Sequence, residues 1–182
     1  METANRLLSY AHAIFGIAKT EDLKEKYYQQ IAALDAMNVT NPDFYNILAA
    51  RSIDKDERKE LAQTVLTGYG FEPNVIYWVW TIIDNNTYHR FHYIAMMCRD
   101  IYHHVFNITR VKITSANELS EPQMDKIKDF FEKKLKRRID VEWHIKPNLI
   151  GGLRIQVNNK TYNNTYRAKL ESLKRELLSK KG

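Results

Sequence analysis

The sequence of 182 residues contains only one cysteine, Cys98. A disulfide within the chain is therefore excluded, and so is a metal site built on several cysteine thiolates. Long apolar runs are also missing. The longest covers residues 75–83 and is broken by Thr81, whereas a bilayer-spanning helix needs roughly 20 apolar residues. The first residues lack the layout of a signal peptide, so we expect neither secretion nor membrane insertion.

The motifs of the common catalytic sites are missing as well. No Gly-x-x-x-x-Gly-Lys-Ser/Thr loop is present to hold a nucleotide phosphate, and no nucleophile with a matching base stands out. The helical stretch 88–106 carries His89, His92, His103 and His104, but a metal site needs converging ligands that this pattern does not supply. The sequence therefore predicts no catalytic residue, no metal and no cofactor.

Charge is distributed unevenly around a net value of +6. Residues 1–107 carry 10 Lys and Arg against 13 Asp and Glu, a balance of −3, whereas residues 108–182 carry 18 against 9, a balance of +9. A step of this size indicates two units with different partners. The basic half could meet nucleic acid, anionic lipid or an acidic protein surface.

Apolar spacing predicts helices in the first half of the chain. Thr20 and the Asn41-Pro42 pair provide helix starts, and Asp54 with Glu57 is similar to a capping box. The expected helices cover residues 4–19, 20–37, 42–50, 54–70, 73–84 and 88–106. The fold class is therefore α+β, with a six-helix bundle at 1–107 followed by a small unit at 108–182.

The pattern of the second unit predicts the order β-α-β-β-α. Val111 and Ile113 alternate on a first strand, and a capping box at Ser120 and Gln123 opens a helix. Residues 139–145 alternate strictly, which is typical of a strand. After the glycine pair 151–152 we expect another strand, a turn at residues 158–160, and a basic helix that starts near Thr165.

The helix expected at 73–84 is apolar around its circumference. Such a helix is either enclosed by its neighbours or has a partner on its outer side. If Val75, Ile76, Val79 and Ile83 cover the core, the remaining sides carry Tyr77, Trp78, Trp80 and Ile82. The first helix has a second apolar stripe, and the two surfaces together could form a groove for a partner. That stripe consists of Tyr10, Ala13, Ile14 and Ile17.

The basic half leaves two questions open. The run at residues 133–138 suits the negative end of a helix dipole, but it would also suit RNA. The terminal helix has one apolar stripe, Tyr166, Leu170, Leu173 and Leu177. This stripe could pack on the small sheet, or it could form a seam that also receives another long helix.

Three segments in order resemble the delta subunit of F-type ATP synthases, the oligomycin-sensitivity-conferring protein family. Residues 10–18, Tyr-Ala-His-Ala-Ile-Phe-Gly-Ile-Ala, are similar to the family's first helix. Residues 110–120 are similar to the strand that opens its second half, and the Leu-Ile-Gly-Gly step at 149–152 is similar to the one before its last strand. Together they span nearly the whole chain.

The resemblance implies two partners. A groove between the first and fifth helices would hold N-terminal helices of the alpha subunits. One wall of this groove would consist of Tyr10, Ala13, Ile14 and Ile17, and the other of Tyr77, Trp78 and Thr81. The second unit would hold the peripheral-stalk b subunit through Leu149, Ile150, Gly151, Gly152, Tyr166, Leu170, Leu173 and Leu177. A charged residue at position 78 should then weaken alpha binding while leaving the chain folded.

The implied function is that of a non-catalytic stator subunit that keeps proton translocation coupled to ATP synthesis or hydrolysis. It would lie at the cytoplasmic face of the cell membrane, as a peripheral member of a membrane complex in a bacterium. Many relatives have Glu-Asn-Gly-Arg after the fifth helix, whereas this chain has Asp-Asn-Asn-Thr at 84–87, so a role for that arginine is not carried over. An RNA-binding protein is the alternative, and a specialised ATPase related to the synthase also remains open.

Overall fold

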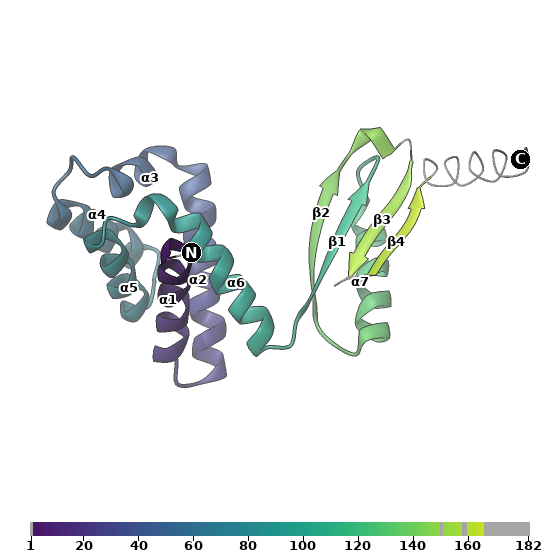
Figure 1. The fold of residues 1–182 in the computed structure, drawn as a ribbon, viewed down its shortest axis with the longest axis horizontal. Helices are drawn as coiled ribbons and strands as arrows, with labels where there is room; N and C mark the ends of the chain where they lie inside the picture. The colour runs from purple at the N-terminus through teal and green to yellow at the C-terminus, as the bar shows by residue number, and fades with distance from the viewer. Residues whose placement is uncertain (1, 150, 158–159, 166–182) are drawn as a thin grey trace, which may run out of the picture. The chain divides into compact units, whose positions relative to one another are not determined.

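A computed structural model describes residues 2–149, 151–157 and 160–165 (Figure 1). The chain divides into two compact units, the first ending at His104 and the second beginning at Val105. No helix in the described ranges is long and apolar enough to cross a bilayer. The class is α+β, with helices gathered in the first unit and a four-stranded sheet in the second.

The helices of the first unit are α1 (Glu2–Ile17), α2 (Glu21–Thr40), α3 (Pro42–Ala49), α4 (Lys55–Gly68), α5 (Pro73–Asp84), the short η1 (Tyr88–Arg90) and α6 (Phe91–Val105). The helix starts expected at Thr20 and Asn41 are confirmed. The Thr20 hydroxyl accepts a hydrogen bond from the Leu23 amide, and the Asn41 side chain accepts one from the Phe44 amide. α2 runs three residues further than expected, and a 3₁₀ turn precedes α6.

The core of the first unit lies where the apolar faces of these helices meet. α2 contributes Ile31 and Leu34, α4 contributes Ala62 and Leu66, and α6 contributes Ile94, all nearly inaccessible to solvent. α5 packs between α4 and α1, so it has helices on two sides. This placement buries Trp78 and Ile82 as well as the expected core face of α5.

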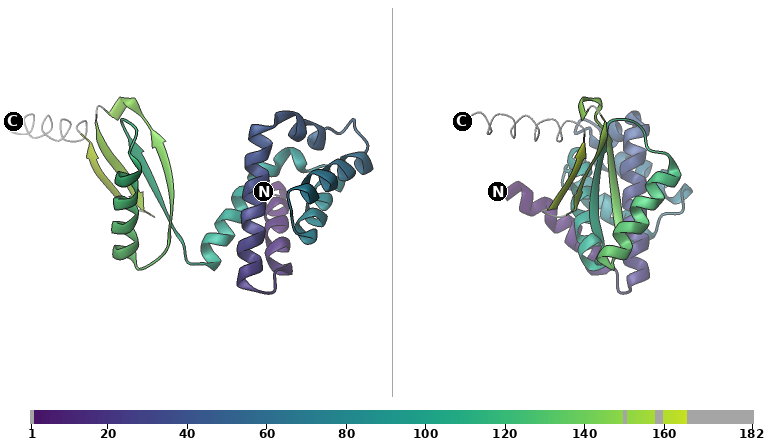
Figure 2. Two further views of the ribbon diagram at one scale, coloured as in Figure 1. Left: turned by 180° about the vertical axis from the view of Figure 1, so that it is seen from behind. Right: turned by 90° about the vertical axis from the view of Figure 1, so that its right-hand side faces the viewer.

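The second unit pairs one helix with the sheet. Its elements are β1 (Thr109–Ser115), α7 (Glu121–Leu135), β2 (Ile139–Ile145), η2 (Pro147–Leu149), β3 (Gly152–Val157) and β4 (Lys160–Thr165). The strand order is β2-β1-β3-β4, with β1 and β2 parallel and the other neighbours antiparallel. α7 lies along one face of the sheet in both views of Figure 2. That face carries Val111, Ile113 and Val157, which pack with Phe131 of α7.

The expected order β-α-β-β-α missed a strand. We expected a turn and then a helix after β3, but residues 160–165 pair with β3 in antiparallel register, Val157 opposite Lys160 and Gly152 opposite Thr165. β4 lies at the end of the strand order, and residues 160–163 are exposed, so it lacks the apolar alternation that marks a half-buried strand. The helix expected from near Thr165 falls outside the described residues.

Candidate functional site

The outward face of α5 is narrower than its sequence indicated. Trp78 was expected on the wall of the groove, and Ile82 on a side of the helix away from the first core face, but Trp78 is only 4% exposed and Ile82 is fully buried. The Trp78 indole donates a hydrogen bond of 2.9 Å from Nε1 to the Tyr10 carbonyl of α1, and its ring meets the Phe91 ring edge-on. Trp78 therefore fastens α5 to α1 and does not form an outer wall.

Between the two ends of α5, the exposed residues are Tyr77 and Thr81. Tyr77 is 57% exposed, and its ring packs edge-on against Trp80, with 5.1 Å between centroids. Trp80 is half-buried because its Nε1 donates a hydrogen bond of 3.2 Å to the Lys59 carbonyl of α4. Tyr77 is thus braced from one side and open to solvent on the other, as is common for aromatic anchors at protein contacts.

The matching residues of α1 also divide into exposed and buried. Ile17 is 49% exposed, Ala13 is exposed and Tyr10 is half-buried, whereas Ile14 is completely buried. Ile14, like Trp78, lies beneath the surface where the prediction placed a contact. We call the exposed or half-buried members of the predicted set the α1–α5 surface: Tyr10, Ala13, Ile17, Tyr77 and Thr81.

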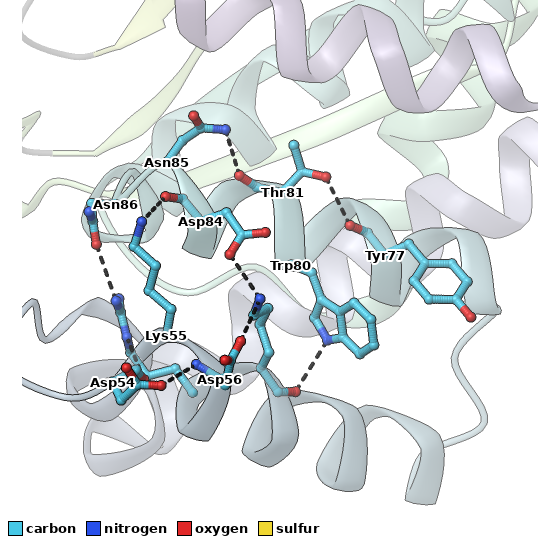
Figure 3. A network of polar contacts seen from close by, with 11 residues as sticks. Asp54, Lys55, Asp56, Tyr77, Trp80, Thr81, Asp84, Asn85 and Asn86 are labelled. Carbon is cyan, nitrogen blue, oxygen red and sulfur yellow. Dashed lines mark hydrogen bonds and ion pairs between the residues drawn. The ribbon is translucent and has the colours of Figure 1, made fainter.

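A polar network fixes the C-terminal end of α5 against the start of α4 (Figure 3). Lys59 Nζ lies 2.8 Å from an Asp56 carboxylate oxygen and 3.0 Å from one of Asp84. Lys55 donates to the Asp84 carbonyl over 2.7 Å. The hydrogen bonds to both carboxylates raise the pKa of Lys59, and the bond from Lys59 lowers the pKa of Asp56. The Lys59–Asp56 pair is intact at neutral pH and is lost as the pH falls through the lowered Asp56 pKa or rises through the raised Lys59 pKa.

Arg58 is a buried residue that the sequence did not single out. Its side chain is 1% exposed. Its guanidinium donates to the Leu48 carbonyl over 3.3 Å and to the Asn86 side-chain oxygen over 3.1 Å. Asn86 has φ of 51°, a left-handed conformation that asparagine tolerates in turns. Arg58 thus connects the end of α3 to the turn that ends α5.

The glycine pair of the second unit has backbone angles that depend on glycine. Gly151 and Gly152 have φ of 128° and 85°, in the region that side chains with a Cβ rarely adopt. They turn the chain from η2 into β3, and Leu149 is buried just before them. A cavity of about 260 Å³ lies beside them, lined by Ser115, Ala116, Asn117, Glu118, Leu119, Gln123, Gly151, Gly152 and Leu153.

Replacing Gly152 with valine should destabilise the second unit by roughly 1–3 kcal/mol, because a β-branched residue is strained at positive φ. Hydrogen exchange of the β1 and β3 amides measures the effect. Gly16→Ala is the control, since an added Cβ meets nothing within 4 Å at this helical position. Unchanged protection in Gly152→Val would show that the bend is not required.

The remaining predicted contacts of the second unit, Ile150, Tyr166, Leu170, Leu173 and Leu177, lie outside the described residues. Of the histidines, His92 pairs with Asp35 at 3.0 Å and His103 is largely buried. In the described ranges no group of three or more His, Cys, Asp or Glu is placed to hold a metal ion.

Comparison with known proteins matches most of the chain to one family. The model of the ATP synthase delta (OSCP) subunit family matches residues 8–177. ATP synthase subunit delta of Mycoplasma mobile is 27% identical over 171 residues, which cover 94% of each chain. ATP synthase subunit delta of Exiguobacterium sibiricum is 29% identical over 174 residues, 93% of this chain and 94% of that one. A chain of the mitochondrial ATP synthase hexamer of Toxoplasma gondii has the same fold, with a TM-score of 0.75, 14% identity and coverage of 94% and 97%.

Proposed function

Because this chain belongs to the ATP synthase delta (OSCP) subunit family, we propose that it joins the catalytic head of a rotary ATP synthase to its peripheral stalk. It is a non-catalytic subunit, and its work is mechanical. It resists the torque of the rotating shaft, so that proton translocation and ATP chemistry stay coupled. It belongs to the peripheral part of a membrane-bound complex, which we place at the cytoplasmic face of a bacterial membrane.

We further propose that α1 to α6 act as one six-helix bundle that binds N-terminal helices of the alpha subunits. The observation that supports this role is the α1–α5 surface, where Tyr77 and Ile17 expose large apolar area on two packed helices. A partner helix would lay its apolar face on this strip, as in other helix-in-groove complexes. The buried Trp78 and Ile14 hold the surface in shape beneath it.

For the second unit we propose binding to the stalk b subunit. The Leu149–Gly152 step and the stripe of Tyr166, Leu170, Leu173 and Leu177 remain predicted contacts. Large, mostly apolar contacts with slow dissociation suit a stator better than exposed ion pairs, which contribute little.

The comparisons give no support to the alternative of RNA binding. The side chains of the sheet also count against RNA binding. The central strands β1 and β3 present Arg110, Lys112, Arg154 and Gln156 on the face opposite α7, and none of these is aromatic. Sheets that read RNA stack bases on aromatic side chains at such positions.

Replacing Tyr77 with glutamate should weaken binding of a synthetic peptide from the alpha-subunit N-terminus by about tenfold or more, because a charge would be buried at the contact. Isothermal titration calorimetry on the full chain measures the affinity. Tyr69→Glu is the matched control, since Tyr69 is 70% exposed and lies outside the α1–α5 surface. Equal affinity of the Tyr77 and Tyr69 variants would count against this surface. No binding by the unsubstituted chain would count against the proposed function.

A further inference from the structure

A second apolar recess lies in the basic unit, beside α7. It has a volume of about 380 Å³ and is formed by one side of α7 together with Ile155 of β3 and Tyr162 of β4. Its floor includes the buried Phe131, whose ring lies 6.0 Å from that of Tyr162. We call this recess the α7–β4 cavity. α7 covers the core strands, and the cavity lies where β4 extends the sheet beyond β3.

The rim of the α7–β4 cavity is aromatic and exposed. Phe130 is 56% exposed and Tyr162 is 42% exposed, although both rings border an apolar recess. Exposed aromatic rings beside a concave apolar surface are typical of protein contact sites. The rings are also ordered with respect to each other, because Lys134 Nζ lies 5.4 Å from the centre of Phe130 and 4.9 Å from that of Tyr162.

Both charged residues that line the described cavity, Lys126 and Lys134, are cations. They are eight residues apart on α7, which corresponds to roughly 12 Å along the helix. By helical spacing Asp125 falls on the opposite side of α7, and Asp129, three residues after Lys126, does not line the cavity. A guest in the cavity would therefore have a positive charge near each end and apolar surface between them.

The charge of the residues around the cavity decides which helix can bind there. The chain's own segment 166–182 has an apolar stripe but carries six Lys and Arg against two Glu, so it would bring positive charge to a positive rim. The unit as a whole, residues 108–182, has a balance of +9. A partner helix with carboxylates at both ends of a short apolar stripe complements both the rim and the unit.

We propose that the α7–β4 cavity is the seat of an amphipathic helix of the stalk subunit, with apolar residues at i and i+4 and carboxylates that meet Lys126 and Lys134. This inference rests on the proposed function and names a surface and a chemistry for its stalk contact. The partner's apolar side chains enter between Phe130 and Tyr162. Its carboxylates lie over the two lysines, which fixes its position along α7.

The test uses the full chain and the soluble part of the b subunit encoded beside it. The double variant Lys126→Glu/Lys134→Glu should bind this probe at least about tenfold more weakly at low salt, and the difference should shrink at high salt as charges are screened. Phe130→Ala should also weaken binding by about tenfold, at all salt concentrations, since it removes apolar contact. Lys128→Glu is the control, because Lys128 is exposed on α7 and does not line the cavity.

Each outcome is informative. Unchanged affinity in both cavity variants, with normal binding by the unsubstituted chain, would overturn this inference and leave the proposed function standing. A lower melting temperature in Phe130→Ala without loss of affinity would show that Phe130 serves the stability of the unit and not partner binding, which also overturns it. Failure of the unsubstituted chain to bind would overturn the proposed function, and this inference with it. Unchanged hydrogen-exchange protection of the β1 and β3 amides in the cavity variants shows that the second unit remains folded.

Discussion

Replacing Arg58 with alanine is expected to lower the free energy of unfolding of the helical unit by roughly 3–4 kcal/mol. The guanidinium is buried, and it donates to the Leu48 carbonyl and the Asn86 side chain. Without it the Leu48 carbonyl remains buried without this donor, the Asn86 side chain loses its partner, and the space that the Arg58 side chain filled is left open. A water-filled gap at this position would also loosen the turn that ends α5.

The measurement uses Cys98, the only cysteine, as a reporter of the first unit alone. Cys98 lies in the core of this unit, and burial raises the pKa of its thiol to about 12. The native thiol is therefore inert, and labelling by a thiol reagent follows opening of the unit. A loss of 3 kcal/mol should accelerate labelling roughly 100-fold if reclosing is fast.

Two further variants separate the causes for Arg58. Arg51→Ala is the matched control, because Arg51 is exposed on the loop before α4, and we expect its labelling rate to stay within about twofold of the original. Arg58→Lys keeps the charge but loses the planar fork, so an intermediate rate is expected. If Arg58→Ala labelled no faster than Arg51→Ala, the buried hydrogen bonds would have no part in holding the unit closed.

Helix starts could be predicted from the sequence where the capping side chain bonds to an amide of the same helix. Thr20 and Asn41 cap helices because a short polar side chain can reach an amide of the next turn, and this depends on no distant residue. The glycine pair was likewise predictable, since positive φ is a local demand. β4 was not, because its residues show neither the apolar alternation of a half-buried strand nor a helical stripe, and its strand character comes from pairing with β3.

Burial depended on tertiary contacts that the sequence does not state. The all-round apolar pattern of α5 was read correctly, but which of its sides meets α1 or α4 is decided by packing. Trp78 therefore lies inside and Tyr77 outside, although they are neighbours in sequence. Arg58 lies in a highly charged stretch, residues 54–60, where an exposed side chain is the ordinary expectation. Its acceptors come from the end of α3 and from the turn after α5.

The burial of Trp78 reverses what its substitution should do. A charged residue there was expected to weaken partner binding and leave the fold intact. Trp78→Ala should instead destabilise the helical unit by roughly 3–5 kcal/mol, because a large aromatic side chain leaves a cavity when truncated. Trp78→Glu should be worse still, since it buries an unpaired carboxylate. Cys98 labelling and the loss of helical circular dichroism on mild heating measure both.

Trp78→Phe distinguishes the two contributions of this side chain. It keeps most of the ring that packs against Phe91 and removes the donor to the Tyr10 carbonyl, so we expect a loss of about 1–2 kcal/mol, well below that of alanine. Tyr77→Glu, one residue away on the exposed strip, should leave the labelling rate nearly unchanged. If Trp78→Glu stayed as protected as Tyr77→Glu, Trp78 would have to reach the surface in solution. The α1–α5 surface would then extend over the indole, with Trp78 itself in contact with the partner helix.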